Sequence, residues 1–152
     1  MFEEEPMGTI GYWAHNLHTW TGAEPFFLTN GDELKEVDLS AMADQHRNSG
    51  AVATIATMEV DNPQEYGVIV FSGNYIKEFL EKPENPPTNF ISSGLYLIDP
   101  VIRDYLSEEL GRGEKFLMIE KHLFPKLAAA KKLAAFKFKG KWFDCGNLDR
   151  WE

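Results

Sequence analysis

Cysteine, basic residues and long apolar runs are scarce in this chain of 152 residues. Cys145 is the single cysteine, so an internal disulfide is excluded and a cytoplasmic protein is expected. No apolar run approaches the roughly 20 residues that a membrane span needs, so no membrane partner is expected. Lysine and arginine number 15 against 24 acidic residues. The resulting net charge of −9 argues against binding to a nucleic-acid backbone.

Core-forming side chains are plentiful. Hydrophobic residues make up 43% of the chain and include 11 phenylalanines and 4 tryptophans. A single domain spanning 1–152 is expected. Short apolar runs predict strands, Ser72-Gly73-Asn74 predicts a hairpin turn, and helical spacing predicts helices between the strands. The predicted strands are 25–29, 51–60, 67–71, 75–80, 90–98 and 133–138, and the predicted helices are 38–48, 100–106 and 118–132.

Strands that alternate with helices predict an α/β fold with a mixed, mostly parallel sheet, flanking helices and one β-hairpin. In such sheets ligands collect beyond the carboxyl ends of the strands. Asp32 comes three residues after the apolar run 25–29, so it is expected to lie in that crevice.

Two aspartates are candidate metal ligands. Asn30-Gly31-Asp32 follows the first strand, and Asp144 follows the last one. One interpretation of both segments is a turn at the end of a strand, where Asn, Gly and Asp are common. The functional interpretation is a pair of carboxylates that bind Mg²⁺, which is usually held by one or two carboxylates with water and substrate phosphates.

Glu81-Lys82-Pro83 ends the strand predicted at 75–80. A solvated charge pair is one interpretation. In the functional interpretation, Lys82 binds a phosphate as a compact point charge, Glu81 accepts hydrogen bonds from sugar hydroxyls and Pro83 fixes the chain direction.

The segment 3–11 is acidic and then rich in glycine. Gly8 and Gly11 would allow a flat ligand to approach the backbone closely. Their spacing is not that of a dinucleotide fingerprint or a Walker loop, so no standard phosphate cradle is predicted.

In this order and at this spacing, the segments resemble those of the sugar-1-phosphate nucleotidyltransferase family. The similarity runs through essentially the whole chain. The triplet at 81–83 matches the family's Glu-Lys-Pro outright. Residues 5–11 resemble the family's base-binding segment, 30–32 its first metal aspartate and 65–68 its sugar-side loop. Residues 89–96 resemble its Asn-x-Gly-x-Tyr strand, 120–128 its Phe-Pro helix and 142–146 its Trp-x-Asp-x-Gly segment.

The resemblance implies a truncated Rossmann-like nucleotide-diphospho-sugar transferase fold. It also implies that a sugar 1-phosphate attacks the α-phosphorus of a nucleoside triphosphate, so that pyrophosphate leaves. Mg²⁺ would be the cofactor. The resemblance assigns catalytic roles to Asp32, Lys82 and Asp144, with the two aspartates on the metal. Gly67, Glu81 and Asn89 would face the sugar, and Gly8 and Glu3 would face a base that the sequence does not specify.

Family members begin with a strand and a Gly-Gly-x-Gly-Thr-Arg-Leu loop that holds the triphosphate and supplies an arginine. Residues 1–152 contain no such segment. The expectation is therefore a domain without the N-terminal part of the family's catalytic unit, with exposed sheet edges that favour homo-oligomers. The alternatives are an inactive fragment, a sugar-phosphate-binding or regulatory module of the same fold, and a subunit with only structural value.

Overall fold

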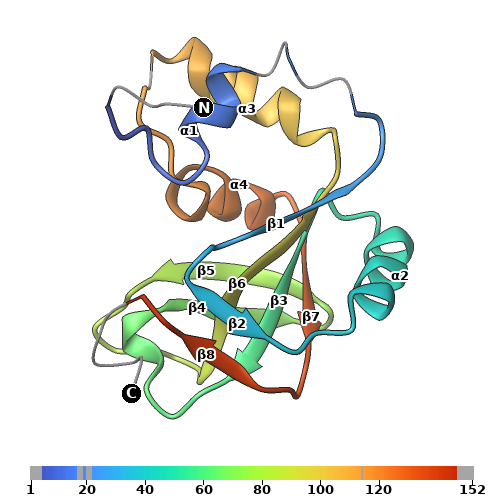
Figure 1. Cartoon of the computed structure of the whole chain (residues 1–152), viewed down its shortest axis with the longest axis vertical. Helices are drawn as coiled ribbons and strands as arrows, with labels where there is room; N and C mark the ends of the chain where they lie inside the picture. Colours follow the sequence, from blue (N-terminus) through green and yellow to red (C-terminus); the bar gives the residue numbers. More distant parts are fainter. Residues whose placement is uncertain (1–4, 17–18, 20–21, 114, 147–152) are drawn as a thin grey trace.

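The computed structural model describes residues 5–16, 19, 22–113 and 115–146. Figure 1 shows a sheet with helices on either side. The elements in chain order are α1 (Gly11–His15), β1 (Phe26–Thr29), β2 (Glu33–Lys35), α2 (Leu39–Ser49), β3 (Ala53–Glu59), η2 (Pro63–Glu65), β4 (Gly67–Ser72), β5 (Tyr75–Glu81), β6 (Phe90–Ile98), α3 (Ile102–Gly111), η3 (Ile119–Leu123), α4 (Phe124–Ala129), β7 (Leu133–Lys137) and β8 (Trp142–Asp144).

The main sheet has six strands in the order β1-β6-β3-β7-β5-β4, and β4 also reaches β6 through the pair Val68 and Ile91. A separate two-stranded sheet pairs β2 with β8 in antiparallel register. We call this two-stranded sheet, residues 33–35 and 142–144, the ribbon. Each of the six predicted strands is confirmed to within two residues, and so is the hairpin, which turns at Gly73 with a φ of 63°.

The α/β class and the mixed sheet are confirmed, but the expectation of mostly parallel strands is wrong. Within the described residues only β3 and β7 pair in parallel. Strands β1, β3 and β7 share one direction, as helical crossovers require. Strand β6, however, lies between β1 and β3 and runs antiparallel to both. The alternation of strands and helices fixes the direction of a strand but not its neighbours.

Both faces of the sheet are covered, which explains why β6 is buried along nearly its whole length. Alternate residues point to opposite faces. Tyr96 and Ile98 join the larger core with the helices α3 and α4, whereas Leu95 and Leu97 join a smaller core with Met42 of α2. Strand β6 is therefore the central, rigid element beside which a site can be built.

Helix α2 begins and ends where its caps predict. The side chain of Asp38 accepts a hydrogen bond from the N–H of Ala41 at 2.9 Å, and Gly50 ends the helix with a φ of 65°. The helix predicted at 118–132 is instead split into a π-helical turn, η3, and the short α4. Pro125 lacks the N–H that a continuous helix needs. No described helix is long and apolar enough to cross a membrane.

Candidate active site

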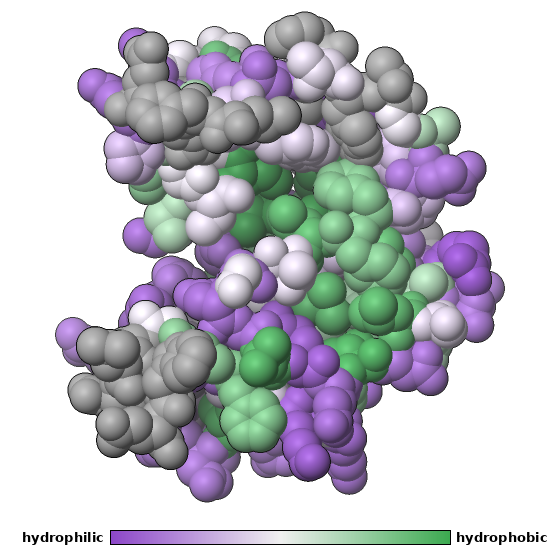
Figure 2. All heavy atoms as spheres, in the orientation of Figure 1, coloured by the Kyte–Doolittle hydropathy of each residue, from purple (hydrophilic) through white to green (hydrophobic). Residues whose placement is uncertain are grey.

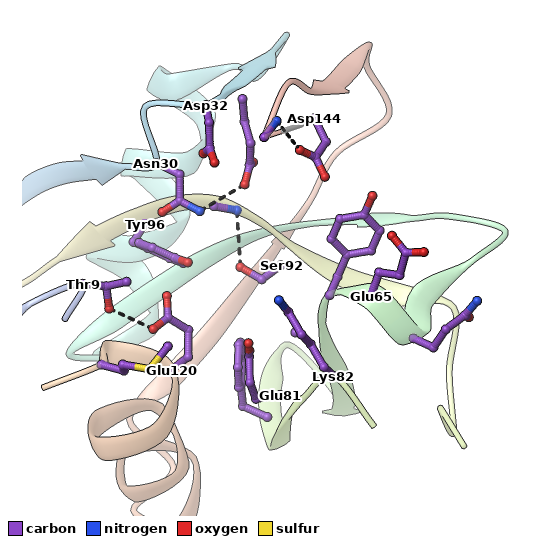
Figure 3. Close-up of a pocket in the computed structure, with 18 residues that line it drawn as sticks. Thr9, Asn30, Asp32, Glu65, Glu81, Lys82, Ser92, Tyr96, Glu120 and Asp144 are labelled. Atoms are coloured by element: carbon purple, nitrogen blue, oxygen red, sulfur yellow. Dashed lines mark hydrogen bonds between the residues drawn. The ribbon is translucent and has the colours of Figure 1, made fainter. Parts of the chain in front are cut away.

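A cavity of about 650 Å³ opens beside the sheet. The turn after β1, the ends of β5 and β8 and the middle of β6 contribute to its lining (Figure 3). Among the described residues that line it, Lys82 has the single ammonium group. Six carboxylates face this one cation, those of Asp32, Glu33, Glu65, Glu81, Glu120 and Asp144. Such a surface repels phosphates, and a metal cation held by the carboxylates would reduce this repulsion.

Asp32 and Asp144 lie together on one wall of the cavity (Figure 3). The ribbon brings them together: Glu33 pairs with Asp144, and the N–H of Cys145 donates to the carbonyl oxygen of Asp32 at 2.8 Å. A Cβ atom on Gly146 would lie 3.0 Å from Asp144 Oδ1 and 3.1 Å from Asp32 Oδ2. Both carboxylates therefore converge on a small space that the glycine leaves open.

The donor chemistry of this pair fits Mg²⁺, a hard cation that binds oxygen ligands and keeps several waters. Within the described ranges, no three His, Cys, Asp or Glu side chains form a complete metal site. Asp32 and Asp144 would therefore be two of the ligands, and water and substrate phosphates would be the others. The side chain of Asp32 makes no hydrogen bond with any described residue and is available for this role.

Tyr66 holds Asp144 in place. Its ring packs edge-on against Trp142 of the ribbon, with the ring centroids 5.3 Å apart. Burial, the charge of Asp144, a hydrogen bond with Asp144 and the charge of Glu33 together raise the pKa of Tyr66 to about 12. The hydroxyl therefore stays protonated at neutral pH and donates to the aspartate.

Lys82 lies opposite the aspartates, with its side chain directed into the cavity (Figure 3). Its φ of 47° is left-handed, a conformation that costs a non-glycine residue on the order of 1–3 kcal/mol. Pro83 normally favours an extended conformation at the residue before it. The N–H of Lys82 donates to the carbonyl oxygen of Tyr66 at 3.1 Å, which helps to enforce this geometry.

Glu81 lies beside Lys82 and lines the same cavity. Burial raises the pKa of its carboxyl group, and the charge of Glu120 adds to the effect, whereas Lys82 and Lys121 oppose it. A half-buried carboxylate of this kind gains most from hydroxyl groups that donate to it. The wall formed by Glu81 and Lys82 thus combines an acceptor for hydroxyls with a cation for phosphate.

The model of the nucleotidyl transferase family matches residues 1–151. This chain belongs to that family. It is 39% identical over 150 residues to mannose-1-phosphate guanylyltransferase 1 of Arabidopsis thaliana. That alignment covers 95% of the chain but 40% of the relative, so the chain spans less than half the length of the curated relative.

Two solved structures share the fold of this chain. A candidate glucose-1-phosphate thymidylyltransferase from Bacillus anthracis, solved with a sucrose, matches with a TM-score of 0.83 and 22% identity, over 97% of this chain and 60% of its own. HddC from Yersinia pseudotuberculosis, complexed with GMP-PN, matches with a TM-score of 0.72 and 24% identity, over 99% and 62%. They confirm the Rossmann-like architecture that the sequence predicts.

Gly67 and Gly8 have clear structural reasons to be glycine. Gly67 lines the cavity, and a Cβ atom there would press into the ring of Phe79. Gly8 has a φ of 81° and packs against the carbonyl group of Leu117. The backbone of Leu117 therefore makes the close approach to Gly8 that was predicted for a flat ligand. The contact of Gly8 with a base stays a prediction.

The structure does not describe one of the two other predicted residues, and the second does not line the cavity. Glu3 lies outside the described residues. Asn89 is exposed before β6 and is not among the residues that line the cavity, although its carbonyl oxygen accepts from the N–H of Val60 at 3.0 Å. Their roles toward base and sugar also stay predictions.

Several lining residues had no assigned role in the sequence. Thr9 donates to Glu120 Oε2 at 2.9 Å and accepts from the N–H of Ile119 at 3.0 Å, which closes the wall opposite the ribbon. Glu120 and Gly146 lie inside segments that resemble the family, and this position was the only sign in the sequence that they could belong to the site. Glu33 had only its place next to Asp32 to single it out.

Proposed function

We propose that this nucleotidyl transferase takes part in moving a nucleotidyl group from a nucleoside triphosphate to a sugar 1-phosphate, with release of pyrophosphate. The observation that carries the proposal is the cavity, in which Asp32 and Asp144 converge on one wall and Glu81 and Lys82 lie on the other. The name of the Arabidopsis relative supports testing mannose 1-phosphate with GTP first. The name of the Bacillus structure makes glucose 1-phosphate with thymidine triphosphate the second pair to test.

The reaction places few covalent demands on the protein, because phosphoryl and nucleotidyl transfer depend mainly on positioning and charge neutralisation. Lys82 would offset the charge of the sugar phosphate and orient its attacking oxygen. Glu81 would accept hydrogen bonds from the sugar hydroxyls. Asp32 and Asp144 would hold Mg²⁺, which supplies charge neutralisation at the nucleotide phosphates.

Binding without turnover is the second candidate function. It is favoured by the absence of a Gly-Gly-x-Gly-Thr-Arg-Leu segment from residues 1–152. Donors of the kind that such a loop provides are typically worth about 10²–10³ in rate apiece. We therefore expect the 152-residue chain by itself to bind sugar 1-phosphate with little or no pyrophosphate release.

Self-association of the chain is the third part of the proposal. Strand β1 is at the edge of the main sheet and, among the described strands, pairs with β6 alone. Apolar side chains gather along β1 on the face shown in Figure 2. Phe27 of β1 is 40% exposed. An unpaired strand edge with apolar neighbours is a template for association with another chain.

Titration calorimetry with mannose 1-phosphate and glucose 1-phosphate tests the binding site. Lys82→Ala should weaken the affinity by roughly 10- to 100-fold, because hydrogen bonds to charged groups contribute about 1.5–3 kcal/mol. Lys139→Ala removes the same charge from an exposed lysine that does not line the cavity, and is the matched control. Equal effects of the two changes would contradict the phosphate role of Lys82.

A turnover assay and a sizing experiment separate the remaining alternatives. The chain is assayed for pyrophosphate release with both triphosphates, both sugar 1-phosphates and Mg²⁺, and its mass is measured by light scattering. Binding without turnover favours the second candidate. A monomer with turnover near roughly 1 s⁻¹, within the usual range for enzymes, would contradict both the inactive chain and the self-association.

A further inference from the structure

The ribbon, which contains Asp144 and begins directly after Asp32, has little apolar packing of its own. Leu34 and Phe143 face each other across it, and their exposed fractions are 66% and 56%. Two-stranded sheets of this length are marginal in water without further support. Contacts on the other face of the ribbon must therefore set the position of Asp32 and Asp144.

Those contacts meet at one carboxylate, that of Glu33. Its Oε1 accepts a hydrogen bond from Asn30 Nδ2 at 3.0 Å, drawn in Figure 3 as a dashed line that starts at Asn30. Its Oε2 accepts from Lys35 Nζ and from Trp142 Nε1, each at 3.0 Å. The three donors come from the turn after β1, from β2 and from β8, so one side chain links both strands of the ribbon to the main sheet.

Strand β6 is shaped to receive this carboxylate. Gly94 has a φ of 65° and lies where the register between β3 and β6 shifts. A Cβ atom there would be 2.5 Å from Glu33 Oε1 and 2.6 Å from Asn30 Nδ2. The N–H of Asn30 also donates to the carbonyl oxygen of Gly94 at 2.8 Å. Bulges beside active sites often re-aim a neighbouring group, and here the bulge makes room for Glu33.

Glu33 differs from its neighbour Asp32 in what its oxygens are free to do. The ion pair of Glu33 with Lys35 is largely buried, with exposed side-chain fractions of 12% and 8%. Both oxygens of Glu33 are already engaged by donors, whereas the side chain of Asp32 has no such bond to any described residue. Glu33 is therefore suited to holding the ribbon and Asp32 to binding a ligand.

We propose that Glu33 is a positioning residue that sets the relation of Asp32 to Asp144 and thereby the affinity of the pair for a divalent cation. The inference rests on the proposed metal-binding role of the two aspartates. Partners that orient metal ligands typically contribute 10- to 100-fold to metal affinity. Glu33→Gln removes the charge that pairs with Lys35 and replaces one of the two acceptor oxygens by a donor N–H₂, so it should loosen the ribbon.

The experiment measures Mn²⁺ binding to the 152-residue chain from the paramagnetic resonance signal of the free ion. Glu33→Gln should weaken binding by roughly ten-fold or more. Glu36→Gln, on the same segment but exposed and outside the cavity, removes the same charge and should leave the affinity within about two-fold of the unmodified chain. A loss shared equally by both variants would show that only the long-range charge of Glu33 matters.

Trp142→Phe provides a second variant with no change of charge. It keeps an aromatic ring but removes the indole N–H that donates to Glu33, so it too should weaken Mn²⁺ binding. Circular dichroism should show the same fold, and mannose 1-phosphate affinity without metal should not move. Unchanged Mn²⁺ affinity in Trp142→Phe and in a folded Glu33→Gln overturns the inference.

Asp32→Asn tells the two levels of the proposal apart. If Asp32→Asn abolishes Mn²⁺ binding while Glu33→Gln leaves it intact, the metal site stands and the role of Glu33 is wrong. If the unmodified chain and Asp32→Asn bind Mn²⁺ equally, the metal site itself is wrong, and the inference falls with it.

Discussion

The six-stranded sheet and the two-stranded ribbon are held together by different physical forces. The sheet is covered on both faces by helices and buries side chains such as Ile55, Ile98 and Leu127 completely. The ribbon leaves Leu34 and Phe143 exposed and is fixed through the carboxylate of Glu33. Apolar burial is roughly proportional to area and has no preferred direction, whereas hydrogen bonds fix geometry. The sheet with its helices therefore provides most of the stability. The ribbon instead sets the positions of the carboxylates.

The largest expected effect breaks the ribbon's chemistry without touching the sheet. In a family protein extended to the full length of the relatives, Asp32→Asn or Asp144→Asn should lower turnover by at least roughly 100-fold, the scale of losing one electrostatic contact in a transition state. The unfolding midpoint in urea should stay the same. Near-normal pyrophosphate release from both variants would remove the metal assignment.

The next-largest effect is on the free energy of unfolding instead of on turnover. Leu106→Ala removes a fully buried side chain of α3 and should lower the free energy of unfolding by about 2–5 kcal/mol. Leu34→Ala makes the same chemical change on the ribbon, where the side chain is exposed, and should stay within about 0.5 kcal/mol. Urea denaturation measures both. Similar losses would mean that the ribbon does belong to the apolar core.

A smaller effect sharpens the boundary between scaffold and site. Gly67→Ala places a methyl group within 3.0 Å of Phe79 Cε1 and should cost about 1–3 kcal/mol through overpacking. Gly31→Ala, beside Asp32, meets no atom within 4 Å and should be nearly neutral. Urea denaturation of the two variants measures both effects. A neutral Gly67→Ala would show that the ring of Phe79 can move aside.

The smallest expected effect is a pH dependence of stability, and it arises where α2 packs against the sheet. His46 is buried against Thr54, with Nδ1 2.8 Å from Thr54 Oγ1. Burial lowers the pKa of His46; Asp99 opposes this shift and Arg47 adds to it. The folded state therefore binds the proton less well than the unfolded state. The stability is complete above the unfolded pKa of about 6.5 and declines as the pH falls below it, by at most about 1.4 kcal/mol per pH unit.

Thermal melts at a series of pH values from about 7.5 down to 5.5, across the unfolded pKa of histidine, test this expectation. His46→Gln should flatten the decline in that window, because the glutamine does not titrate. An unchanged slope in the variant would assign the pH dependence to other groups, such as the cluster of carboxylates in the cavity.

The sequence by itself determined six of the strands, the helix α2 and much of the site. Period-two apolar runs specify strands because each strand must bury at least one face, and Asp38 and Gly50 mark the ends of α2 through their own backbone preferences. Family-like segments such as Asn30-Gly-Asp32, Glu81-Lys-Pro83 and Trp142-Phe-Asp-Cys-Gly146 identified the family. Five of the predicted site residues line the cavity, namely Asp32, Gly67, Glu81, Lys82 and Asp144.

Only the tertiary structure decided which strands are neighbours, and so which side chains meet. No local pattern announces that β6 enters between β1 and β3, because pairing depends on contacts between residues far apart in the sequence. The same is true of Glu33, whose partner Trp142 lies 109 positions away. Its charge and its place after Asp32 are visible in the sequence, but its function depends on a bulge at Gly94 and on donors that the folded chain alone brings together.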